Sequence, residues 1–302
     1  MSGGFDLTAY LAGEAGPIQA ALERAVHGLG AILPPDVSAA VAHGVLAGGK
    51  RLRPVLCVTA YRACGGADPG EAPYDLAASL ELIHAYSLMH DDLPCMDDAE
   101  LRRGRPTTHR LHGDDATIRG GAALIAAAAL RCWDAAVRLG CAPPAAGHVT
   151  SRLLSAAGGG GMVGGQWVDL EGEGQSLGAD ELDGLHRRKT GALLEASLLV
   201  GARAAGASPA ELSGLATYGR AVGLAFQIAD DILDATQDAA TLGKNPSDAA
   251  LEKSTYVALY GLDEARRRAR DQVDAAVAAL SGAGLDAPAL VTLARYVVER
   301  QH

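Results

Sequence analysis

Helix-length apolar segments follow one another along most of this chain. Between clusters of Pro and Gly, stretches of about 15–25 residues carry apolar side chains at spacings of three and four. This spacing gives a helix one buried face. Hydrophobic residues make up 49% of the chain but aromatic residues only 4%, and the abundance of Ala and Leu favours helices over strands. The sequence therefore predicts an all-α fold.

Neither a second domain nor a targeting segment is indicated. No flexible linker divides the sequence, so we expect one domain over residues 1–302. Residues 1–19 lack the basic start and apolar core of a signal peptide, and apolar runs such as residues 122–130 are shorter than a membrane span.

The five cysteines form neither metal-type pairs nor an even set, which indicates reduced thiols. We expect a cytoplasmic protein without stable membrane insertion, and the net charge of −10 opposes nucleic-acid binding.

The sequence FQIADDILD places polar side chains on one face of an apolar helix. Counted from the first, these residues lie at offsets 0, 3, 4 and 7 and are Gln227, Asp230, Asp231 and Asp234. Three carboxylates on one stripe repel one another and would ordinarily mark a solvated surface. Here the apolar neighbours, among them Val222, Phe226 and Ile232, indicate a largely buried helix. Carboxylates on such a helix need cations.

A second acidic cluster, DDLPCMDD, follows another apolar helix. Pro94 cannot continue that helix, so Asp91 and Asp92 lie near its C-terminal end. The helix dipole disfavours carboxylates there by about 0.3–1 kcal/mol each, and Asp97 and Asp98 add further negative charge. A bound metal ion would explain this placement. Because the candidate ligands are all oxygens, the expected ion is Mg²⁺, which commonly bridges to substrate phosphates.

Four basic segments accompany these clusters in an otherwise acidic chain. They are GGKRLRP, LRRGRP, HRRKTG and the pair Lys244 and Lys253. One such segment alone is typical of a solvated face, but together they suit phosphate oxygens, which Arg and Lys commonly bind. The chain has no P-loop motif, and its Gly-rich run at 158–165 indicates close helix packing rather than a phosphate cradle. The predicted substrate has a diphosphate head and a hydrocarbon tail.

Taken together, these motifs resemble those of the trans-polyprenyl diphosphate synthases, most closely the bacterial farnesyl diphosphate synthases. The resemblance extends from about Gly48 to the C-terminus. Its landmarks are GGKRLRP, ELIHAYSLMHDDLPCMDDAELRRGRPTTH, GGQWVDL, HRRKTGALLEAS, FQIADDILD and TLGKNPSDAALEKSTYVAL. It implies an isoprenoid synthase fold, with antiparallel helices around a central cavity, and a homodimer.

The resemblance also implies roles for individual residues. About three Mg²⁺ ions are expected to hold an allylic diphosphate through Asp91, Asp92, Asp97, Asp230, Asp231 and Asp234. Direct contacts to that diphosphate are expected from Arg102, Lys189 and Lys244, with Thr190 and Gln227 beside it. Isopentenyl diphosphate is expected to bind Lys50, Arg53, His84 and Arg103, although a buried structural histidine is the alternative for His84. Asp248 and Lys253 match a loop that closes over the diphosphate.

The implied reaction condenses isopentenyl diphosphate head-to-tail with dimethylallyl and geranyl diphosphate. The allylic C–O bond ionises, the isopentenyl double bond attacks the cation, and a proton is lost. The expected product is C15 farnesyl diphosphate. Tyr86, with Ser87 beside it, lies about 7.5 Å before Asp91 along the helix and would limit the tail. Geranylgeranyl (C20) and geranyl (C10) diphosphate synthases are the alternatives.

The chain departs from the family pattern after the acidic cluster DDLPCMDD. Where the family has Gly-Asp-Ala-Leu, this sequence has residues 120–123 as Gly-Gly-Ala-Ala, so the carboxylate expected at Gly121 is missing.

Two other classes of protein compete with a prenyltransferase. A non-catalytic prenyltransferase subunit would lose one Asp-rich motif, and both are present. A terpene cyclase would line its cavity with aromatic residues, but the chain has two Phe and two Trp.

Overall fold

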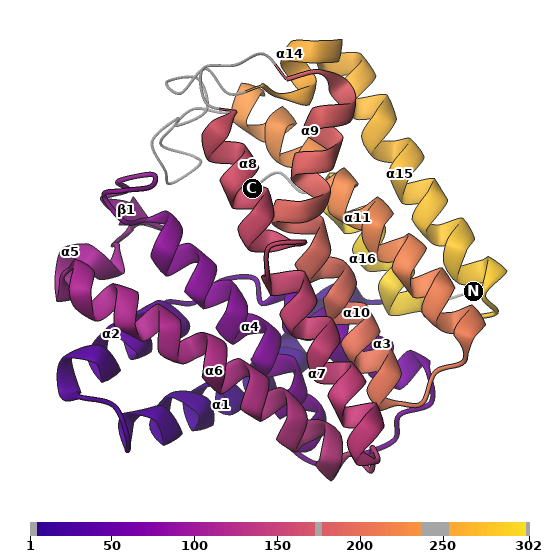
Figure 1. Ribbon diagram of the computed structural model, residues 1–302. Coiled ribbons are helices and arrows are strands. Elements are labelled where there is room, and N and C mark those ends of the chain that lie inside the picture. The colour runs from indigo at the N-terminus through magenta and orange to yellow at the C-terminus, as the bar shows by residue number, and fades with distance from the viewer. Residues whose placement is uncertain (1–4, 173–176, 237–253, 300–302) are drawn as a thin grey trace. The chain divides into compact units, whose positions relative to one another are not determined.

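The computed structural model describes residues 5–172, 177–236 and 254–299, which are helical apart from loops and one short hairpin (Figure 1). The all-α fold is therefore confirmed. Backbone contacts divide the chain into two compact units, which we describe separately. The N-terminal unit comprises residues 8–154 and 200–206, and the C-terminal unit comprises residues 1–7, 155–199 and 207–302. The single domain over residues 1–302 stays a prediction.

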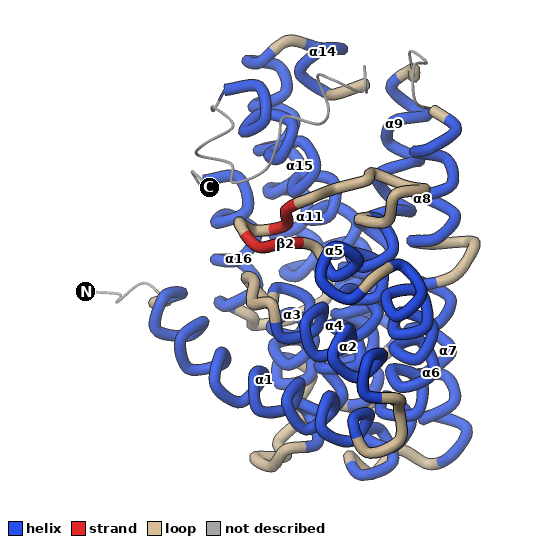
Figure 2. The backbone as a smooth tube through the Cα atoms, turned by 90° about the vertical axis from the view of Figure 1, so that its left-hand side faces the viewer, coloured by secondary structure: helices blue, strands red, loops and turns tan. Residues whose placement is uncertain are grey.

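In the N-terminal unit the elements surround one buried helix. They are α1 (Leu7–Gly30), α2 (Pro35–Leu46), α3 (Leu52–Ala63), α4 (Ala72–Asp91), β1 (Leu101–Arg102), β2 (Arg105–Pro106), α5 (Thr108–His112), α6 (Asp114–Arg138) and most of α7 (Pro143–Ala157). Helix α4 packs along α6 and also contacts α2 and α3 (Figures 1 and 2). Residues 75–83 are all buried, because neighbours cover α4 on every side. β1 and β2 pair antiparallel between α4 and α5.

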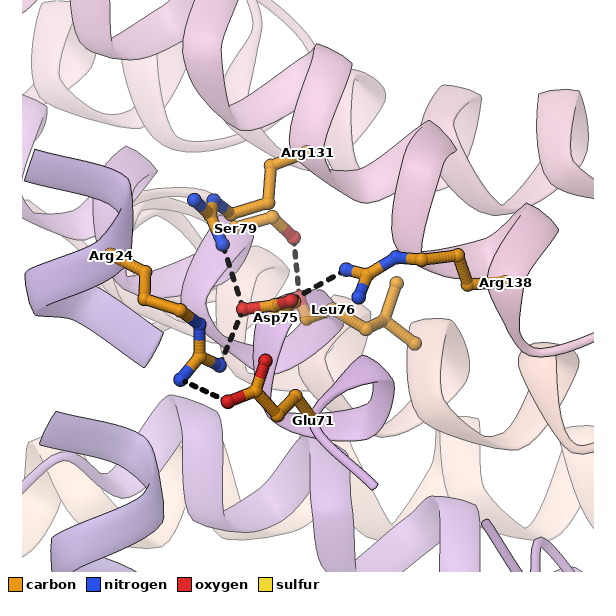
Figure 3. Close-up of polar contacts among 7 residues, drawn as sticks. All are labelled: Arg24, Glu71, Asp75, Leu76, Ser79, Arg131 and Arg138. Carbon is orange, nitrogen blue, oxygen red and sulfur yellow. Dashed lines mark hydrogen bonds and ion pairs between the residues drawn. The ribbon is translucent and has the colours of Figure 1, made fainter. Parts of the chain in front are cut away.

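A buried carboxylate ties α4 to two of its neighbours. Asp75 is 4% exposed and accepts hydrogen bonds from Arg24 of α1 at 2.8 Å and from Arg131 and Arg138 of α6 at 2.8 and 2.5 Å (Figure 3). Burial raises the pKa of Asp75, but hydrogen bonds from Arg138 and Arg24 outweigh it and hold that pKa below its usual value. Since these partners are distant in the sequence, the carboxylate fixes α1, α4 and α6 in one arrangement.

In the C-terminal unit the elements pack around α11. They are α8 (Met162–Glu171), α9 (Ala179–His186), the π-helix η1 (Arg187–Gly191), α10 (Ala192–Ala204, up to residue 199), α11 (Pro209–Thr236), α14 (Tyr256–Tyr260), α15 (Leu262–Gly282) and α16 (Pro288–Glu299). Helix α11 packs along α15 and contacts α16 and η1 (Figure 1). The fully buried Tyr218 of α11 donates its hydroxyl to the Leu290 carbonyl of α16 at 2.7 Å. These contacts hold the FQIADDILD segment on a fixed helix.

One described helix, α6, is long and apolar enough to cross a membrane by length and composition. The sequence prediction considered unbroken apolar runs, whereas the complete helix extends from Asp114 to Arg138. A buried core helix meets the same criterion. Helix α6 packs against α4, α2 and α5, and its Arg131 and Arg138 are paired with Asp75.

Candidate active site

The acidic face of α11 forms one wall of a cavity in the C-terminal unit. The cavity has a volume of about 180 Å³, and its polar lining includes Asp169, His186, Lys189, Gln227, Asp230, Asp231 and Asp234. The four predicted side chains of FQIADDILD therefore share one face, as their spacing predicts. Asp230 and Asp234 are half-buried and Asp231 is 8% exposed, so this stripe is no freely solvated surface. Lys189, which belongs to the basic segment HRRKTG, lines the same cavity.

The π-helical turn η1 sets the position of Lys189. A Cβ atom at Gly165 of α8 would lie 2.2 Å from the Lys189 backbone nitrogen, and one at Gly223 of α11 would lie 3.0 Å from the Cα of Gly191. The two glycines thus let the backbones of α8 and α11 approach η1 closely, which agrees with close helix packing at residues 158–165. Wide turns of this kind are frequent at functional sites. Thr190, the next residue of η1, is half-buried and lies outside the residues that line the cavity.

Asp169 is a site residue that sequence reasoning missed. Its Oδ2 accepts a hydrogen bond from Lys189 Nζ at 2.5 Å, and both side chains line the cavity. The carboxylate therefore orients the ammonium group and partly balances its charge. The only signal in the sequence is its place inside GGQWVDL, since nothing in the spacing links residue 169 to residue 189.

A cluster of polar and aromatic side chains contacts the acidic face of α11. The Tyr256 backbone N–H donates to Asp231 Oδ2 at 2.6 Å, and the Tyr256 hydroxyl donates to Asp183. The Tyr256 ring stacks on His186, with centroids 5.7 Å apart, and a His186 nitrogen lies 3.3 Å from the Gln227 amide nitrogen. Burial, followed by the bond to Asp183, raises the pKa of Tyr256, so its phenol stays protonated. The sequence analysis assigned no role to Tyr256, Asp183 or His186.

The acidic cluster DDLPCMDD lies in the N-terminal unit and begins at the end of α4. Asp92 is 3% exposed and accepts hydrogen bonds from Arg102 Nε at 2.8 and 2.9 Å, and Arg102 Nη2 lies 2.6 Å from its Oδ1. The β1–β2 hairpin delivers this arginine. Asp91 is half-buried and Asp97 is exposed, and the Asp97 N–H closes a turn onto the Asp91 carbonyl at 2.9 Å. The structure thus joins Arg102 to the acidic cluster with which it was predicted to act.

A group of arginines surrounds His84 in the same unit. Burial lowers the pKa of His84 well below its usual value, and Arg53, Arg103, Arg102 and Arg51 lower it further, so the imidazole is neutral at pH 7. Burial also lowers the pKa of Arg53 to about 10. Glu81 pairs with Arg51 at 2.7 Å and offsets one of these charges. The surplus of guanidinium groups over carboxylates makes this patch suited to an anion.

The backbone is left-handed at three residues of the segments GGKRLRP, DDLPCMDD and LRRGRP. Arg51, Asp98 and Arg103 have φ angles of 49°, 44° and 55°, and they are the non-glycine residues with positive φ in the described part of the chain. Such conformations cost about 1–3 kcal/mol each and cluster at functional sites. Arg103 donates to the Gly48 carbonyl, which joins the GGKRLRP loop to the β1–β2 hairpin. Lys50, in that loop, is exposed.

The remaining predicted residues fall into two groups. Tyr86 and Ser87 lie on α4 before Asp91, where Tyr86 is half-buried and the Ser87 hydroxyl donates to the His84 carbonyl at 2.9 Å. Lys244, Asp248 and Lys253 lie outside the described residues. The described residues contain no cluster of three His, Cys, Asp or Glu side chains that could hold a metal alone.

Comparisons with known proteins agree on the family. The family model for polyprenyl synthetases matches residues 34–284. Farnesyl diphosphate synthase of Escherichia coli is 44% identical over 268 residues, which cover 85% of this chain and 87% of that protein. The chloroplastic geranylgeranyl pyrophosphate synthase of Catharanthus roseus is 38% identical over 304 residues, which cover 100% and 83%.

Solved structures give the same result. The geranyltransferase of Legionella pneumophila superposes with a TM-score of 0.83 at 29% identity and covers 97% of each chain. An FPP/GFPP synthase from Zymomonas mobilis superposes with a TM-score of 0.76 at 34% identity, covering 93% of this chain and 97% of that one.

Proposed function

This chain belongs to the polyprenyl synthetase family and is a prenyltransferase, and we propose that it converts isopentenyl diphosphate with dimethylallyl and geranyl diphosphate into farnesyl diphosphate. The observation that carries the proposal is the cavity in which the carboxylates of α11 meet Lys189 and Gln227. Such a site binds a polyanion through cations held between carboxylates. The arginine patch around His84 provides a second anion site, as two diphosphate substrates require.

Mg²⁺ is the proposed cofactor, and when bound it neutralises the charge that develops on the departing diphosphate. Asp91, Asp97, Asp230 and Asp234 offer the oxygen ligands that Mg²⁺ prefers. Asp92 and Asp231 are also proposed ligands. Each already accepts a hydrogen bond, from Arg102 and from the Tyr256 N–H respectively, so each is held in a fixed orientation.

The protein's own residues position and stabilise the reacting groups. Lys189 and Arg102 donate hydrogen bonds to the allylic diphosphate as its C–O bond breaks and it keeps the electron pair. Arg53, Arg103 and Lys50 hold isopentenyl diphosphate, with the neutral His84 beside it. The isopentenyl double bond attacks the allylic cation to form the new C–C bond. The proton then leaves the neighbouring carbon for the released diphosphate, so no side-chain base is needed. Leu177, Leu182 and Leu185 line the same cavity and would help to exclude water that quenches the cation.

A C15 product is favoured by Tyr86, whose ring lies on α4 before Asp91 and is half-buried. The second candidate is a geranylgeranyl diphosphate synthase, because relatives with that name match the whole chain at 38% identity. The two candidates share every diphosphate contact and differ in the depth available to the tail.

We further propose a homodimer in the cytoplasm. Helix α6 exposes Leu130, Trp133 and Val137, which are 72%, 38% and 43% accessible and lie at i, i+3 and i+7 on one face. Arg131, one residue after Leu130, is paired with Asp75 inside the protein, which argues against a lipid partner for this helix. A second copy of the chain would cover such a stripe symmetrically.

The test is incubation of purified protein with isopentenyl and dimethylallyl diphosphate, with Mg²⁺ or with a chelator, followed by mass analysis of the products. We expect C15 product that requires Mg²⁺. A C20 or C10 product would overturn the chain length but keep the prenyltransferase reaction. The absence of condensation with dimethylallyl, geranyl and farnesyl diphosphate would overturn the proposed catalysis and favour a non-catalytic subunit.

A further inference from the structure

The His90 ring occupies the space beside Gly121. A Cβ atom at Gly121 of α6 would lie 2.2 Å from Nε2 and 2.6 Å from Cδ2 of His90, the residue that precedes Asp91 on α4. No side chain fits at position 121 while the ring stays in place, since real Cβ contacts are almost never shorter than about 3.0 Å. The ring therefore lies where a side chain at position 121 would begin, at the position where the family pattern expects a carboxylate.

The His90 ring also contacts the Tyr86 ring. Tyr86 lies one turn earlier on the same face of α4, and the two rings meet edge to face with centroids 4.6 Å apart. His90 is thus in contact with the Gly121 backbone and with the phenol ring. His90 Nε2 is buried and has no hydrogen-bond partner among the described residues.

We infer that Gly121 and His90 form a size-matched pair that fixes the Tyr86 ring, which makes His90 a positioning residue for product length. The inference rests on the proposed function, in which Tyr86 limits the hydrocarbon tail. A smaller side chain at position 90 leaves the Tyr86 ring free to turn toward α6, which deepens the space for the tail. A larger side chain at position 121 pushes the His90 ring toward Tyr86.

The first experiment compares the products of wild-type enzyme, His90→Ala and Tyr86→Ala with all three allylic substrates. We expect the ratio of C20 to C15 product to rise about tenfold or more in both variants, which corresponds to about 1.4 kcal/mol. Because C15 product is the precursor of C20 product, the ratios are compared at equal conversion of isopentenyl diphosphate, so that loss of folded enzyme in a variant does not obscure the result. An unchanged ratio in His90→Ala, with a raised ratio in Tyr86→Ala, would overturn the inference alone. Unchanged ratios in both would also overturn the chain-length argument of the proposed function.

The second experiment tests the pairing directly. Gly121→Ala is expected to lower turnover about tenfold because the added methyl group displaces His90. The double variant Gly121→Ala with His90→Ala is expected to recover turnover to within about threefold of His90→Ala. Gly120→Ala is the matched control, because a Cβ atom there would meet Val41 and Met89 at 3.2 and 3.3 Å and not His90. Equal failure of the Gly121→Ala single and double variants, or rescue of Gly120→Ala by His90→Ala, would contradict the pairing.

Discussion

At the scale of single residues, Asp169 orients the ammonium group of Lys189, which we propose as a ligand of the diphosphate. Lys189 Nζ lies 2.5 Å from Asp169 Oδ2, and the two side chains are 27% and 14% exposed. Replacement by Asn keeps the shape but removes the charge that orients Lys189. We therefore expect Asp169→Asn to lower kcat/KM for the allylic diphosphate about tenfold, or about 1.4 kcal/mol, in steady-state assays.

The matched control removes the same kind of charge from the same helix. Glu171 is exposed at the end of α8 and lies outside the residues that line the cavity. Glu171→Gln is expected to change kcat/KM by less than about twofold, since an exposed charge is well screened. An equal effect of both substitutions would show that Asp169 acts only through the general field of α8.

At the scale of helices, Asp75 joins α1, α4 and α6 through three arginines (Figure 3). Asp75→Asn removes the one buried carboxylate that these guanidinium groups share. Because Arg24 and Arg138 are 34% and 48% exposed, solvent reduces the cost below that of a fully buried pair. We expect a loss of about 2–4 kcal/mol in the free energy of unfolding, measured with denaturant.

The pH dependence of this loss has a definite sign. The pKa of Asp75 is lowered in the folded state, so its contribution is complete above the unfolded pKa of about 3.9 and disappears as pH falls through the folded value. The difference between wild type and Asp75→Asn should therefore shrink below about pH 4. Glu71→Gln is the control, since Glu71 is 66% exposed and pairs with the same Arg24, and it should cost less than about 0.5 kcal/mol. A comparable loss from both variants would refute the role given to Asp75.

At the scale of the whole molecule, the sequence predicts what repeats locally and misses what depends on distant partners. The spacing of Gln227, Asp230 and Asp234 predicts their shared face, since a helix repeats every 3.6 residues. By contrast, Asp75 meets Arg24 across 51 residues, and Asp169 meets Lys189 across 20. The place of His90 against Gly121 depends on how closely α4 and α6 pack. Contacts of this kind follow from the fold and leave no local pattern.

The exposed stripe of α6 belongs to the same scale, because the partner that we propose for it is a second copy of the chain. Leu130 and Trp133 lie on the exposed side of α6, opposite the residues that pack against α4, and form one apolar stripe with Val137. We expect the wild-type protein to have twice the mass of one chain in light scattering, and Leu130→Glu with Trp133→Glu to yield the monomer mass. Ile32→Glu is the control, since Ile32 is 77% exposed in the turn after α1 and is not part of the stripe, and should leave the dimer intact. A wild-type monomer, or a dimer that survives both charges on α6, would contradict this interface.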